Sequence, residues 1–148
     1  MKRILTIIVL LTMGGLQLSA QTKSKAKPAA KVTKVPAAVM ANGNKIYGQY
    51  CLSCHMADGG GVQNMNPPLN GTSYVLGDKT RLIKVILNGF SQNVDIDGES
   101  YTNVMAPHNF LKDQEIADVL SYIRNSFGNK SSGISATEVK AVRAKNKK

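Results

Sequence analysis

The chain has 148 residues, enough for one domain, and it contains no Trp and few aromatic residues, so a core built from side chains alone would be modest. Its net charge of +10 is concentrated at the two ends: residues 41–128 hold six Lys or Arg and eight Asp or Glu, whereas residues 21–40 and 129–148 are strongly basic. A nucleic-acid-binding protein carries its Lys and Arg on the folded body, so this distribution argues against one.

The first 20 residues have the organisation of a secretory signal peptide. Lys2 and Arg3 precede an apolar run over residues 4–11, and Ser19-Ala20 offers small residues at a cleavage site. The alternative is an uncleaved membrane anchor, which requires about 20 apolar residues. A pair of glycines ends the apolar stretch before that length, so we expect export with cleavage.

Residues 21–40 consist mainly of Lys, Ala, Pro, Val and Thr and show no periodic apolar face. Segments of this composition form linkers that need not fold. The five lysines of this linker are suited to weak contact with an anionic membrane surface or an acidic partner. A solvated spacer is the simpler interpretation.

A first helix is predicted from about Asn42, a favourable N-cap residue, into the segment that begins at Cys51. Ile46 and Tyr50 are four residues apart and therefore share one face of this helix. The helix thus has an apolar side to bury.

The most specific pattern in the chain is Cys51-Leu52-Ser53-Cys54-His55. Two thiols three positions apart on a helical segment lie about one turn from each other, on the same side. This separation suits the two vinyl groups along one edge of haem, each of which accepts a thiol as a thioether, and places His55 against the ring. Cys-x-x-Cys-His is the attachment signature of c-type haem.

Other uses of the two cysteines have less support. A thioredoxin-like redox pair needs a βαβ context that the flanking sequence does not supply. A structural zinc site needs four ligands, and the chain has only two Cys and two His. A disulfide is the default for two cysteines of an exported protein and stays open as an alternative.

Downstream, the glycine-rich residues 56–61 end the first helix. A helix is predicted over residues 79–88, with Asp78 as its N-cap and Gly89 as its stop. Residues 94–101 alternate in character around a central Asp-Gly pair, which predicts a small hairpin with a two-residue turn.

The last strong helix is predicted over residues 113–127, closed by Gly128. Its apolar stripe consists of Ile116, Val119, Leu120, Ile123 and Phe127. Ser135 and Glu138 have the spacing of a capping box and predict a short final helix, followed by a Lys-rich tail.

Taken together, residues 42–128 resemble a class I cytochrome c. The resemblance implies an all-α cytochrome c fold, in which helices wrap around one covalently bound haem c with its iron and a small β-hairpin precedes a Met ligand. It implies that Cys51 and Cys54 form the thioethers and that His55 is the proximal iron ligand.

The same resemblance assigns further roles. It implies that the Pro67 carbonyl accepts a hydrogen bond from the ligand histidine and that Leu69 packs on the haem. Gly43 and Tyr47 correspond to the glycine and aromatic pair with which the first helix crosses the last helix closely.

The chain offers five candidates for the distal iron ligand: Met40, Met56, Met65, Met105 and His108. The resemblance favours Met105, although Ala106 stands where the family often has Pro directly after the Met. Met105 also lies in an extended segment far enough along the chain to cross the ring, whereas Met56 adjoins His55 and cannot reach the opposite face. His108 is the main rival, because imidazole is also a good iron ligand, and we expect it at the surface.

These observations predict a periplasmic electron carrier that is not an enzyme. It would accept electrons from a dehydrogenase or respiratory donor and pass them to an oxidase or another acceptor, and nucleic acid is not an expected partner. The hairpin and the segment after residue 127 look most like small cytochromes paired with periplasmic sugar or alcohol dehydrogenases. Two alternatives stay open: a haem enzyme or gas sensor with a labile sixth ligand, and an electron-accepting dehydrogenase subunit docked through its basic ends.

Overall fold

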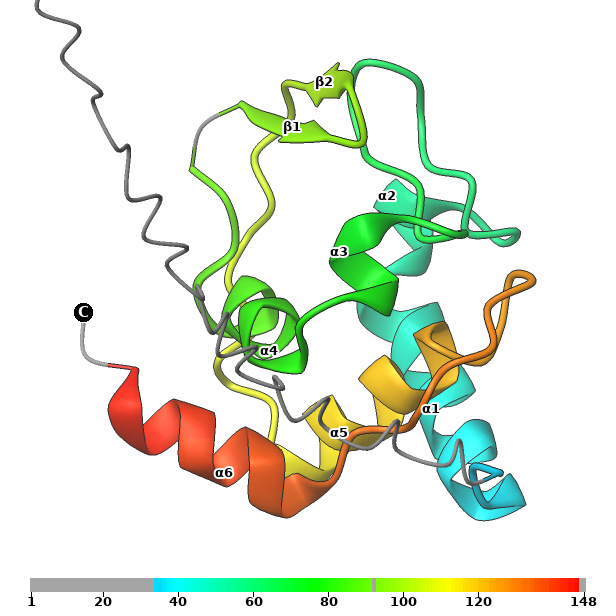
Figure 1. The fold of residues 1–148 in the computed structure, drawn as a ribbon, viewed down its shortest axis with the longest axis vertical. Coiled ribbons are helices and arrows are strands. Elements are labelled where there is room, and N and C mark those ends of the chain that lie inside the picture. The colour runs from blue at the N-terminus through cyan, green and yellow to red at the C-terminus, as the bar shows by residue number, and fades with distance from the viewer. Residues whose placement is uncertain (1–33, 92, 147–148) are drawn as a thin grey trace, which may run out of the picture.

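The structure, a computed structural model, describes residues 34–91 and 93–146 (Figure 1). The predicted signal peptide and residues 21–33 of the predicted linker lie outside these residues. The elements in chain order are α1 (Ala37–Tyr50), α2 (Leu52–His55), α3 (Ser73–Leu76), α4 (Lys79–Asn88), β1 (Val94–Ile96), β2 (Glu99–Tyr101), α5 (Asp113–Ile123) and α6 (Ala136–Lys145). The prediction of a helical fold with one small hairpin is confirmed.

The first helix begins earlier than predicted. The expected start near Asn42 is wrong, because α1 begins at Ala37, directly after Pro36, and so includes the last four residues of the predicted linker. Proline has a backbone angle compatible with a helix start, and the two alanines that follow it are strong helix formers. Asn42 therefore lies inside the helix, where its side-chain amide donates a hydrogen bond to Asp118 at 3.4 Å.

Helices α1 and α5 cross closely at Gly43. A Cβ atom on Gly43 would overlap the carbonyl oxygen of Asp118 and lie 2.5 Å from the Cβ of Tyr122. One turn later, the Tyr47 ring packs against Tyr122, with ring centroids 5.6 Å apart. The predicted contact of Gly43 and Tyr47 with the last helix is confirmed.

The end of α5 differs from the prediction. The helix ends at Ile123 rather than Phe127, and Phe127 has a left-handed backbone with φ of 56°. The turn brings the Phe127 ring to 5.2 Å from the ring of Tyr47, on α1. The Phe127 side chain therefore packs against the core from a turn after α5, and not from a further turn of the helix.

The middle of the chain folds as predicted. Asp78 caps α4 by accepting a hydrogen bond from the Arg81 amide at 2.6 Å, and Gly89 ends it. Strands β1 and β2 pair antiparallel, with Ile96 opposite Glu99 across the two-residue turn.

The C-terminal helix α6 lies across α4 and α5 (Figure 1). The predicted capping box starts it: the Ser135 hydroxyl accepts from the Glu138 amide at 3.3 Å, and the Glu138 carboxylate accepts from the Ser135 amide at 2.8 Å. Val139 and Val142 are buried, so this helix is part of the folded body.

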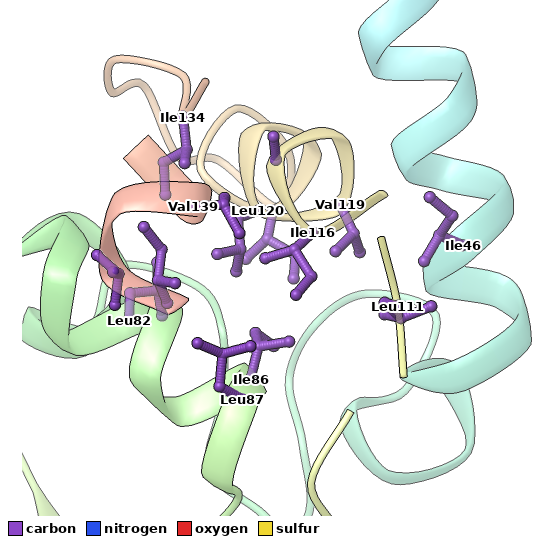
Figure 2. Close-up of a cluster of buried hydrophobic side chains, with 14 of the residues drawn as sticks. Ile46, Leu82, Ile86, Leu87, Leu111, Ile116, Val119, Leu120, Ile134 and Val139 are labelled. Carbon is purple, nitrogen blue, oxygen red and sulfur yellow. The ribbon is translucent and has the colours of Figure 1, made fainter. Parts of the chain in front are cut away.

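Figure 2 shows the main core, where side chains of α4, α5 and α6 converge and Ile46 of α1 approaches from the other side. The labelled members are Ile46, Leu82, Ile86, Leu87, Leu111, Ile116, Val119, Leu120, Ile134 and Val139. A second, smaller cluster of Val94, Ile96 and Tyr101 lies on the hairpin. Across residues 34–91 and 93–146, every helix is too short or too polar to cross a membrane.

Candidate haem site

A cavity of about 270 Å³ opens between the core and the hairpin. Its walls come from the end of α1, from α2, from the segments 66–69 and 103–108, and from α4, α5 and the hairpin. Six predicted site residues line it together: Cys51, Cys54, His55, Pro67, Leu69 and Met105. Segments more than 50 residues apart in sequence thus meet around one mainly apolar space.

His55 is oriented by a backbone carbonyl. Its Nδ1 lies 2.9 Å from the carbonyl oxygen of Pro67, and because a carbonyl can only accept, Nδ1 carries the proton. This leaves Nε2 free to bind a metal. Burial lowers the pKa of His55, which favours the neutral imidazole that metals bind, although the Pro67 carbonyl acts in the opposite direction.

The two cysteines lie on one helical turn. Cys51 joins α1 to α2. Its carbonyl accepts hydrogen bonds from the backbone amides of Cys54 at 3.2 Å and His55 at 2.9 Å. Burial, reinforced by Cys54, raises the pKa of Cys51 to about 11. In the part of the chain that the structure describes, no three His, Cys, Asp or Glu side chains converge into a metal cluster.

Met105 lies on a segment tied to the end of α4. Its amide donates to the carbonyl of Phe90 at 3.0 Å, and the amide of Phe90 donates back at 2.9 Å. Gly89 lies directly against this pair, since a Cβ there would overlap the Met105 carbonyl oxygen. The other methionines within residues 34–91 and 93–146 do not line the cavity, and Met56 and Met65 are 45% and 47% exposed.

His108 is half-buried and faces the cavity, so the expectation that it lies at the surface is wrong. The residue lines the cavity, its Nδ1 is buried, and within the described residues this atom has no hydrogen-bond partner. The backbone amide of His108 donates to the Ile86 carbonyl at 2.7 Å, which ties this segment to α4. Its ring lies 6.3 Å from the ring of Tyr50 and 5.8 Å from that of Phe110.

Two buried polar residues support the site and were missed at the sequence level. The Asn129 side chain donates to the Leu69 carbonyl at 2.8 Å and accepts from the Gly71 amide at 2.8 Å, which holds the segment that carries Leu69. The Arg124 guanidinium binds the carbonyls of Val75 and Ser132, and burial lowers its pKa. No local motif marks either residue, because each acts on segments far away in the sequence.

The donors around the cavity fit a flat apolar cofactor that is attached through two thiols and bound by an imidazole. The fold and this site therefore define a small helical haem protein of the c type. The Cytochrome c family model matches residues 40–127, and the chain belongs to this family. The protein binds haem c, with its iron, covalently and transfers electrons, and the predicted resemblance to a class I cytochrome c is confirmed.

Three curated relatives illustrate the similarity. A cytochrome c-552 from one strain of Thermus thermophilus is 39% identical over 118 residues, covering 74% of this chain and 79% of the relative. A second Thermus thermophilus cytochrome c-552 is 40% identical over 114 residues, covering 71% of this chain and 86% of the relative. The cytochrome c subunit of a quinone alcohol dehydrogenase from Gluconobacter oxydans is 36% identical over 103 residues, covering 68% of this chain and 22% of that subunit.

Proposed function

We propose that this protein is a periplasmic electron carrier, not an enzyme, whose single haem c is attached through Cys51 and Cys54 and ligated by His55 and Met105. The observation that carries this proposal is the shared cavity lined by both thiols, the oriented imidazole and the thioether. The haem supplies a one-electron couple when it is bound.

His55 and Met105 would hold the iron together. His55, with Nδ1 bonded to the Pro67 carbonyl, presents Nε2 in a fixed tautomer. Met105 offers a thioether, a weak donor to ferric iron, which would raise the reduction potential. With both residues bound, the iron would have no coordination site left for a substrate.

The walls of the cavity serve the same function. Apolar side chains such as Val75, Leu82 and Leu120 keep water away from the site. Exclusion of water limits the solvent rearrangement that accompanies a change of charge, and this favours fast electron transfer.

The partners are redox proteins. Relatives include the cytochrome subunits of quinone alcohol dehydrogenase and of fructose dehydrogenase, which supports a dehydrogenase as the electron donor. The lysines of residues 21–40 would dock an acidic partner or touch an anionic membrane surface weakly. The charged and apolar character of residues 1–20 supports export to the periplasm.

The test is expression of the full chain together with haem-attachment machinery. A pyridine haemochrome spectrum with two thioethers and an intact mass that includes one haem on a chain beginning at Gln21 would support the proposal. A colourless, stably folded chain without added mass would contradict it.

A labile sixth ligand would make the protein a haem enzyme or gas sensor instead. One observation favours this second candidate: the Nδ1 of His108 is buried in the same cavity and has no hydrogen-bond partner among the described residues. The two functions differ in their response to carbon monoxide: a carrier held by Met105 binds it slowly in the reduced state, whereas an open site binds it rapidly.

A further inference from the structure

We propose that Arg143, on α6, is a positioning residue that keeps Met105 in place on its side of the cavity. Arg143 lies outside residues 40–127, which the family model matches. The inference rests on the proposed role of Met105 as an iron ligand.

The Arg143 guanidinium makes three hydrogen bonds to one short segment. Its Nε donates to Asp113 Oδ1 at 2.7 Å, its Nη1 to the Asn109 carbonyl at 2.8 Å and its Nη2 to the Leu111 carbonyl at 2.6 Å. All three acceptors lie within residues 109–113, between Met105 and the body of α5. A planar fork with several fixed donors holds separate acceptors at once, which the single ammonium of a lysine does less well.

The segment around Met105 has little burial of its own. Ala106, Pro107 and Asn109 are exposed, and Phe110 is 62% exposed. Upstream, the segment is held by the pair of backbone hydrogen bonds between Phe90 and Met105. Downstream, the His108 amide donates to the Ile86 carbonyl, Leu111 is buried, and Arg143 fixes the carbonyls on either side of Phe110. Loss of Arg143 would therefore free the carbonyls of residues 109 and 111, and the Met105 segment would keep only the His108 amide bond and the buried Leu111 as anchors on its downstream side.

Helix α6 is attached to the body independently of Arg143. Val139 and Val142 are buried, and the Asn88 and Asn146 side chains exchange hydrogen bonds at 3.1 and 2.9 Å. Lys79 on α4 pairs with Glu138 at 3.0 Å. The Arg143 side chain thus projects from a helix that is packed against the body by other contacts.

This arrangement supplies a matched control. Glu138→Gln weakens the ion pair between Lys79 and Glu138 without touching residues 109–113. The two ion pairs are similarly exposed: the side chains are 29% and 42% accessible in Lys79–Glu138 and 33% and 29% accessible in Arg143–Asp113. A general loosening of α6 would affect both variants, whereas the hydrogen bonds to residues 109–113 are lost only in the Arg143 variant.

The experiment uses haem-loaded full-length protein and imidazole as the probe. Imidazole competes with the thioether for ferric iron, and its binding is followed by loss of the red sulfur-to-iron absorption band. We expect Arg143→Gln to bind imidazole about tenfold more tightly than wild type, as expected for the loss of about one charge-assisted hydrogen bond. Arg143→Lys should be intermediate, and Glu138→Gln should stay within about twofold of wild type.

The outcomes distinguish a failure of the proposed role of Arg143 from a failure of the proposed role of Met105 as an iron ligand. If Arg143→Gln and Glu138→Gln show equal imidazole affinities and equal losses of melting temperature, Arg143 is an ordinary structural residue and the inference is overturned. Should Arg143→Gln fold too poorly to titrate, the intermediate affinity of Arg143→Lys decides the question. If Met105→Ala keeps the red band, the ligand assignment itself fails, whatever the Arg143 variants do.

Discussion

Gly43 of α1 lies so close to α5 that a Cβ atom on it would be 2.5 Å from the Cβ of Tyr122. The two helices can approach to this distance only because position 43 has no side chain. Their crossing packs α1 against α5 and so positions Cys51 and His55, which directly follow α1, beside the core.

Gly43→Ala should therefore destabilise the haem-loaded protein. Alanine favours a helix over glycine by up to ~1 kcal/mol, but the overlap with the Asp118 carbonyl should cost more, for a net loss of about 1–3 kcal/mol. Gly48→Ala is the matched control, since Gly48 lies on the exposed face of the same helix with no atom within 4 Å of an added Cβ. Gly48→Ala should be neutral or stabilising in urea unfolding, and equal behaviour of the two variants would contradict the close crossing.

Met105→Ala should remove the red absorption band and lower the reduction potential by on the order of 100 mV, because a thioether stabilises ferrous iron. Met65→Ala should change neither property, since Met65 is exposed and does not line the cavity. Spectra and voltammetry of the two variants check this. A wild-type spectrum without the red band, together with an unchanged potential in Met105→Ala and a shifted potential in His108→Ala, would assign the iron-ligand role to His108.

Tyr47→Phe should give a stability difference that depends on pH. The Tyr47 hydroxyl donates to the Met56 carbonyl at 2.6 Å, and its loss should cost about 1 kcal/mol near neutral pH. Burial raises the pKa of Tyr47 above its ordinary value of about 10. The unfolded chain therefore loses this proton before the folded one does, so the stabilising effect is complete below pH 10 and declines as the pH rises further. Urea unfolding between pH 7 and pH 11 should show the gap between wild type and Tyr47→Phe shrinking above pH 10, and a constant gap would count against the burial.

Replacing the lysines of residues 21–34 with glutamine should slow reduction by an acidic dehydrogenase. The effect should be several-fold at low salt and vanish near 1 M salt, where charges are screened within about 3 Å. Stopped-flow rates at several salt concentrations measure it, with Lys45→Gln on α1 as a control for general charge loss. Equal rates for all proteins at low salt would mean that the N-terminal lysines form a spacer.

The chain sequence by itself determined the features that depend on residues a few positions apart. Asp78 starts α4, Ser135 and Glu138 start α6, and Asp97-Gly98 turns the hairpin, because caps and turns are satisfied locally. The Cys-x-x-Cys-His pattern predicted the cofactor for the same reason, since its chemistry fits within about one helical turn.

The features that depend on contacts between residues far apart in the sequence were decided only by the tertiary structure. The Phe127 ring packs against the ring of Tyr47 from a turn after the helix, and the segment that carries His108 is held by a hydrogen bond from its amide to the Ile86 carbonyl. Arg143 acts on Asn109, 34 positions earlier, and no local pattern marks that pairing. Each of these contacts is made by chain segments that meet only after folding, so its free energy cannot be predicted from the spacing of residues along the sequence.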